Sequence, residues 1–95
     1  MSKNQDYEDR HRTFRVASYG IVGGDVILSL KDTGETGRSY IAHFPKSEVD
    51  EFLARNRIHY RNLNGSSVVA NVRKERNSSS TKVTGLVGMA SQPAL

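Results

Sequence analysis

The sequence predicts a small β-rich α+β domain with five strands and one helix, in the order β-β-β-α-β-β. Short stretches of alternating apolar and polar residues recur between glycine-rich turns, a pattern typical of antiparallel strands. Only one stretch places apolar residues at helical spacing. The chain has 95 residues, which is room for one domain. We expect that domain over 13–88, with flexible tails at 1–12 and 89–95.

The first three strands are expected over 13–19, 25–31 and 38–44. Glycines end the first strand, and a turn with two further glycines joins the other two, which form the strongest hairpin in the sequence. The residues expected to alternate onto one face of these strands are Phe14, Val16, Val26, Leu28, Leu30, Tyr40, Ala42 and Phe44.

The only predicted helix covers 47–57, and Ser47 is the expected N-cap. Acidic residues crowd its first turn and arginines its last, which suits the helix dipole at both ends. Val49, Phe52 and Leu53 form a narrow apolar stripe at spacings of three and four residues. We expect this stripe to dock the helix on the sheet.

Strands four and five are expected over 66–73 and 81–88, joined by a polar, basic loop. Asn64-Gly65 marks a turn before strand four. Gly85 and Gly88 thin strand five and predict a bulge or a close backbone approach.

This element order is similar to that of the oligonucleotide-binding barrel, whose helix lies between strands three and four and closes one end. The similarity is in element order alone and covers about 13–88. It implies a small five-stranded barrel that binds through strands two and three and through the loops joining strands one to two and four to five. An open antiparallel sheet with one helix fits the same order.

Charge is unevenly distributed along the chain, whose formal net charge is +4. Residues 1–51 carry seven Lys/Arg against nine Asp/Glu, whereas residues 52–95 carry seven Lys/Arg and only Glu75. A basic half of this kind attracts polyanions. The chain has no cysteine, no apolar run of membrane-spanning length and a polar N-terminus, so we expect a cytoplasmic protein with no membrane partner.

These features predict a small non-enzymatic accessory protein that binds single-stranded or structured nucleic acid. We expect loop cations to hold phosphates, helix-exit arginines to help, and tyrosines to stack on bases. Arg15, Arg38 and Tyr40 lie on strands that could adjoin this surface. The predicted binding residues are Tyr19, Arg55, Arg57, Tyr60, Arg61, Arg73, Lys74, Arg76 and Lys82.

A protein-binding module, or a small inhibitor or regulator of a larger complex, is the alternative. Its surface would be an exposed sheet edge or the acidic first turn of the helix, with Glu48, Asp50 and Glu51. An edge strand weakened by Gly85 and Gly88 would also allow a homodimer.

Asp32-Thr33-Gly34 resembles the catalytic tripeptide of retroviral-type aspartic proteases, short enzymes in which two chains each give one aspartate. Lys31 and Glu35 on either side, and a helix where that family has a flap, depart from its pattern. The same tripeptide is common in hairpin turns. The three histidines lack ligand spacing, so the sequence predicts no metal site and no cofactor.

Overall fold

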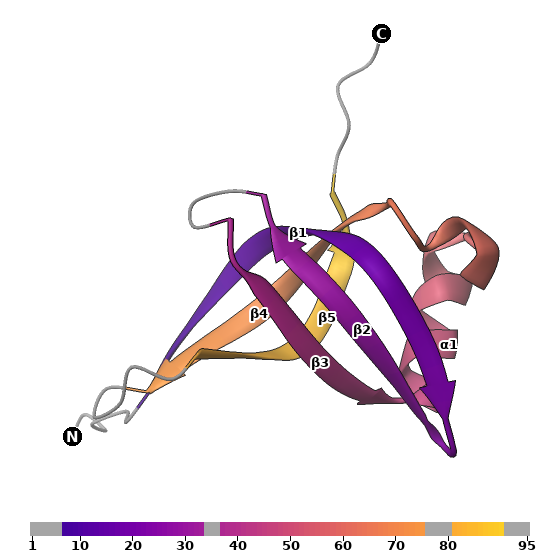
Figure 1. The fold of residues 1–95 in the computed structure, drawn as a ribbon, viewed down its shortest axis with the longest axis horizontal. Helices are drawn as coiled ribbons and strands as arrows, with labels where there is room; N and C mark the ends of the chain where they lie inside the picture. Colours follow the sequence, from indigo (N-terminus) through magenta and orange to yellow (C-terminus); the bar gives the residue numbers. More distant parts are fainter. Residues whose placement is uncertain (1–6, 34–36, 76–80, 91–95) are drawn as a thin grey trace, which may run out of the picture.

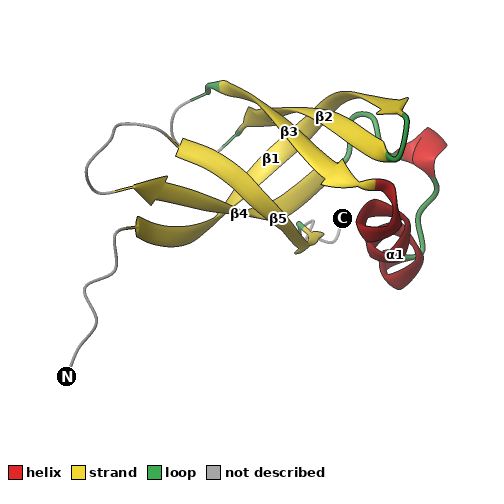
Figure 2. Cartoon of the chain, turned by 90° about the horizontal axis from the view of Figure 1, so that it is seen from below, coloured by secondary structure: helices red, strands yellow, loops and turns green. Residues whose placement is uncertain are grey.

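The computed structural model describes residues 7–33, 37–75 and 81–90. They form one curled antiparallel sheet in the strand order β3-β2-β1-β4-β5, with a helix across one end (Figure 1, Figure 2). The predicted β-β-β-α-β-β order is confirmed. The elements are β1 (Tyr7–Val22), β2 (Asp25–Asp32), β3 (Ser39–Pro45), α1 (Lys46–Asn56), a 3₁₀ turn (Tyr60–Asn62), β4 (Ser67–Glu75) and β5 (Thr81–Met89).

The curl of the sheet originates in β1, a strand of 16 residues that arches over the molecule (Figure 1). Its first part pairs with β4, and its second part pairs with β2. A register shift between Val16 and Ser18 marks a β-bulge, which bends a strand and increases its twist. One bent strand is therefore shared by both halves of the sheet.

The two edge strands, β3 and β5, approach each other without forming a hydrogen-bonded pair. The sheet is therefore a curled half-barrel, intermediate between the two architectures that the sequence predicted. It is similar to the partly open five-stranded barrel of the oligonucleotide-binding fold, with α1 across one end (Figure 2).

The core fills the inside of the curl and contains the alternating residues of the predicted strands. The predicted hairpin is confirmed, with Leu28 opposite Ala42. Tyr40 is only half-buried, at the edge of the core. The buried apolar residues are Phe14, Val16, Val26, Leu28, Leu30, Ala42, Phe44, Val49, Phe52, Leu53, Leu63, Val68, Ala70 and Val72. Among the described residues, Asp32 is the one buried charged side chain.

The helix confirms the predicted apolar stripe, because Val49, Phe52 and Leu53 are all buried. The predicted N-cap is wrong: α1 begins at Lys46, and Pro45 occupies the cap without a side-chain hydrogen bond. The reason is a tertiary contact, since the Lys46 N–H donates to the Gly24 carbonyl oxygen at 2.8 Å. In the described parts of the chain, no helix has the length and apolar character to cross a membrane.

Strand boundaries also differ from the sequence prediction. Residues 7–12 were predicted to be a tail, but they belong to β1. Their backbone hydrogen-bonds to β4, and this pairing does not require apolar side chains. The same strand continues through Gly20 to Val22, and the turn follows at Gly23, whose φ is +60°. Strand β5 continues to Met89, and its register shifts confirm the predicted bulge.

Candidate nucleic-acid interface

The residues predicted to bind nucleic acid form two groups at opposite ends of the half-barrel (Figure 1). One group lies where α1 ends and consists of Tyr19, Arg55, Arg57, Tyr60 and Arg61. The other lies on the hairpin of β4 and β5 and consists of Arg73, Lys74 and Lys82. Arg76 falls outside the described residues. The structure therefore does not join the predicted residues into one surface.

The two predicted stacking residues at the helix end contact each other. The ring centroids of Tyr19 and Tyr60 are 5.3 Å apart and their planes are inclined by 37°. The Tyr60 hydroxyl donates to Asp50 Oδ1 at 2.6 Å, and Lys46 Nζ lies 3.0 Å from Asp50 Oδ2. These contacts fasten the turn after α1 to both the helix and β1.

The hydrogen bond between Tyr60 and Asp50 shifts both pKa values. It lowers the pKa of Asp50, with a further contribution from Lys46. The pKa of Tyr60 is raised, first by burial and then by the hydrogen bond to the carboxylate. The Asp50 contribution to stability is present above the ordinary aspartate pKa and is lost as pH falls. The Tyr60 contribution is present below the ordinary tyrosine pKa and is lost as pH rises above the raised value.

We expect Tyr60→Phe to raise the pKa of Asp50 towards the ordinary value of about 3.9, because its main stabilising donor is removed. The measurement is an NMR titration of the side-chain carboxyl carbons. Tyr40→Phe is the matched control, because Tyr40 packs on Phe14 away from Asp50 and its replacement should leave this titration unchanged. An Asp50 pKa that is the same in the parent and in Tyr60→Phe would contradict the assigned hydrogen bond.

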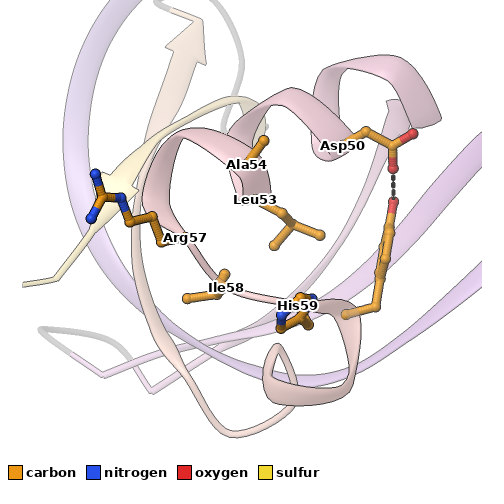
Figure 3. Close-up of a pocket in the computed structure, with 7 residues that line it drawn as sticks. Asp50, Leu53, Ala54, Arg57, Ile58 and His59 are labelled. Atoms are coloured by element: carbon orange, nitrogen blue, oxygen red, sulfur yellow. Dashed lines mark hydrogen bonds between the residues drawn. The ribbon is translucent and has the colours of Figure 1, made fainter.

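A cavity of about 440 Å³ lies beside this cluster, between α1 and the turn that follows it (Figure 3). Arg57 stands at its edge in the left-handed conformation, with φ at 58°, and its side chain extends away from Leu53 and Ile58 (Figure 3). The cavity thus has one arginine at its edge, where a phosphate backbone would need several cations. Its lining residues are Asp50, Leu53, Ala54, Arg57, Ile58, His59 and Tyr60.

The hairpin cations point to both faces of the sheet. Arg73 lies on the outer face and holds Asp9 of β1, with Nε–Oδ1 at 2.9 Å and Nη2–Oδ2 at 3.3 Å. This hydrogen bond lowers the pKa of Asp9. Lys82 is exposed opposite Arg73 on β5. Lys74 alternates to the inner face, where it meets a different set of residues.

That inner face forms a cavity of about 360 Å³ at the end of the half-barrel opposite α1, which we call the barrel mouth. Its walls come from the beginning of β1, the end of β4, and the beginnings of β3 and β5. Among its described lining residues, four side chains are cationic and Glu8 alone is acidic. The lining residues are Glu8, Arg10, Arg12, Arg38, Tyr40, Val72, Lys74 and Thr81.

Asp32 lies beside the barrel mouth and is only 1% exposed. Its Oδ2 is 3.5 Å from Arg12 Nε, and the Arg12 side chain is 18% exposed. The Asp32 N–H also donates to the Arg38 carbonyl oxygen at 2.8 Å. Asp32 is buried within its own barrel and paired with Arg12, so it is placed to orient that arginine. An aspartic protease would instead need this carboxylate to face the same residue of a second chain.

Sequence reasoning placed only Lys74 of the mouth cations in the binding set. Arg10 and Arg12 were assigned to a tail because 1–12 lacks an apolar face, and Asp32 was assigned to a turn. The sequence did contain a usable signal: Glu8, Arg10 and Arg12 share the two-residue period of Phe14. Extending that period backwards places all three on the inner face, where the structure has them.

The outer face of β2 and β3 has fewer side chains suited to binding a nucleic acid than the barrel mouth has. Strands two and three form the binding surface of oligonucleotide-binding barrels. Here their outward residues include Lys31, His43 and Ile41, which is 64% exposed. None of the outward residues described on these two strands is Phe, Tyr or Trp, and His43 has the one aromatic ring among them. This face therefore offers bases only one small ring for stacking.

No protein-family model, curated protein or solved structure matches this chain. Within 7–33, 37–75 and 81–90, no group of three or more His, Asp or Glu side chains could hold a metal ion. The convergence of cations at the barrel mouth is the strongest functional feature of the described chain.

Proposed function

We propose that this protein is a non-enzymatic accessory protein that binds nucleic acid, with the barrel mouth as the principal phosphate site. The observation that carries the proposal is the convergence of Arg10, Arg12, Arg38 and Lys74 on one cavity. These residues come from distant parts of the chain, and only the fold brings their charges together. Positive charges that line a concave site raise the local concentration of anions.

The chemistry of the mouth suits a nucleotide. Arginine forks form paired hydrogen bonds with phosphate oxygens, and lysine adds a compact charge. Tyr40 lines the same cavity and packs edge-to-face on Phe14, with ring centroids 5.6 Å apart. A base that contacts the Tyr40 ring would gain stacking energy. On the outer face at this end of the sheet, Lys82 would hold a neighbouring phosphate.

The test is fluorescence anisotropy of a labelled single-stranded oligonucleotide at about 50 and 200 mM salt. Four phosphate contacts on a single strand give a slope of log K against log salt near −2.8, so affinity should fall about 50-fold. In the double variant Arg10→Ala/Lys74→Ala we expect about two contacts to remain. The slope should then be near −1.4, and the fall about sevenfold.

The matched control is Arg55→Ala/Arg61→Ala, which removes the same charge from exposed residues at the helix end. We expect it to retain the slope of the parent protein. An equal loss in both double variants would show that net charge and not the mouth governs binding. Absence of binding by the parent at 50 mM salt would overturn the proposed function.

A protein-binding module is the second candidate, favoured by exposed apolar residues at the turn between β1 and β2. Ile21 is 46% exposed and Val22 is 63% exposed, and α1 begins beside them. If a second copy covers this site, Ile21→Ser/Val22→Ser should lower the mass found by sedimentation equilibrium. A parent protein that is monomeric at high concentration would exclude the homodimer.

A further inference from the structure

We infer that the barrel mouth receives the phosphorylated end of a nucleic-acid strand, so that a terminal phosphate supplies one of the four phosphate contacts proposed above. This inference rests on the nucleic-acid binding proposed above and names the part of the ligand that the site recognises. The ligand chemistry is a terminal phosphate monoester, at either the 5′ or the 3′ end.

The barrel mouth is closed at its inner end, so its shape suits the end of a strand. Tyr40, which lines the cavity, rests on Phe14, and Phe14 is fully buried. Core side chains fill the barrel behind Phe14, and α1 covers the opposite end (Figure 2). A strand therefore has no path through the barrel, so the part of it that enters the mouth is an end.

The positive charges of the mouth are arranged around a single space. Proteins that follow an internal backbone place their cations along a groove. Here cations from β1, from β4 and from the residue before β3 surround one space of about 360 Å³. A phosphate monoester carries about −1.5 to −2 charges at pH 7 and has three strong acceptor oxygens, whereas an internal diester carries one charge. The cations that converge on the mouth therefore match the charge of a terminal phosphate monoester better than that of an internal diester.

A buried carboxylate supports one of the cations of the mouth. Asp32 is 1% exposed and holds Arg12 through Nε, and Arg12 also lines the cavity. A guanidinium fixed in advance loses less side-chain entropy when it binds an anion. Asp32 is thus a positioning residue, which acts on the ligand through Arg12.

Glu8 is the one carboxylate among the described residues of the cavity wall, and it opposes a bound anion. It lies 3.4 Å from Arg10, and the side chains of Arg10 and Glu8 are 63% and 60% exposed. An ion pair this exposed is weak, so a phosphate can replace Glu8 as the partner of Arg10. Glu8→Gln should therefore strengthen binding of a phosphorylated end.

The experiment compares three oligonucleotides of one sequence: one with a 5′-phosphate, one with a 3′-phosphate and one with hydroxyls at both ends. An internal label reports anisotropy at about 50 mM salt. We expect one phosphorylated end to bind about tenfold more tightly than the hydroxyl form, the value of one extra charge-assisted hydrogen bond. Comparing the two phosphorylated forms identifies which end enters.

Two variants separate a positioned guanidinium from charge alone. Arg12→Lys keeps the charge but loses the fork, and we expect it to lose most of the tenfold preference while the hydroxyl oligonucleotide binds nearly as before. The control Arg55→Ala/Arg61→Ala should keep the preference. Circular dichroism spectra and melting temperatures confirm that each variant is folded.

The outcomes for the inference and for the proposed function are distinct. Equal affinity of the parent protein for all three oligonucleotides would overturn end recognition and leave nucleic-acid binding in place. A preference that survives Arg12→Lys but disappears in Arg55→Ala/Arg61→Ala would overturn the assignment to the mouth. Failure to bind any of the three would overturn the proposed function itself.

Discussion

Replacing Phe52 with alanine is expected to lower the free energy of unfolding by about 3–5 kcal/mol, the usual cost of removing a buried aromatic ring. Phe52 is 1% exposed and belongs to the stripe by which α1 closes one end of the half-barrel. A domain of this size is stable by only about 4–11 kcal/mol. The variant should therefore unfold at much lower urea concentration than the parent.

The control for Phe52→Ala is Glu51→Ala, one residue earlier on the exposed side of the same helix. Like Phe52→Ala, it changes the helix propensity of α1 only slightly, but it leaves the core intact. We therefore expect almost no shift in the urea midpoint. Phe52→Leu should lie between the two, because most of the cavity is refilled. A similar stability for Phe52→Ala and Glu51→Ala would show that α1 is not docked on the barrel.

Asp32→Asn is expected to cost about 3 kcal/mol of unfolding free energy, measured in the same way. The substitution preserves size but removes the carboxylate charge that lies 3.5 Å from Arg12 Nε, in a side chain that is only 18% exposed. Breaking one side of a buried ion pair typically costs 3–5 kcal/mol. Asp9→Asn is the matched control, because the Asp9–Arg73 pair is on the outer face and its loss should change stability little.

A second variant tests whether the loss in Asp32→Asn comes from removing only one partner of the ion pair. Replacing both partners, as in Arg12→Met/Asp32→Leu, removes the pair without leaving a buried charge. We expect it to be more stable than Asp32→Asn, since apolar replacements of buried pairs are often neutral. If the double variant is the less stable of the two, the pair itself contributes net stability.

The fold was largely predictable because its main cues are local. The hairpin of β2 and β3 follows from two-residue alternation on both sides of a glycine-rich turn, and the observed strands agree within one residue at each boundary. The stripe of α1 follows from helical spacing alone. Ser47 failed as an N-cap because the chain passes directly from β3 into α1, held by a backbone bond from Lys46 to the β1–β2 turn.

The binding residues were much less predictable, because their grouping depends on strand pairing over long sequence separations. Asp9 and Arg73 are 64 residues apart in sequence and hydrogen-bonded in space. Dividing the chain into an acidic and a basic half concealed the barrel mouth, since Arg10, Arg12 and Arg38 belong to the acidic half. The arginines at the helix exit are conspicuous in the sequence, but they lie at the end of α1 and in the turn that follows, away from Lys74 in the barrel mouth.

The sequence by itself determined a β-rich domain with one amphipathic helix, its core residues and an excess of positive charge. These properties follow from periodicity and composition, which act over a few residues. Only the tertiary structure decided that β1 extends back to Tyr7, that Asp32 is a buried partner of Arg12, and that four cations meet in one cavity. The physical reason is that backbone pairing of β1 with β4 fixes which side chains share an inner face, and no local pattern specifies that pairing.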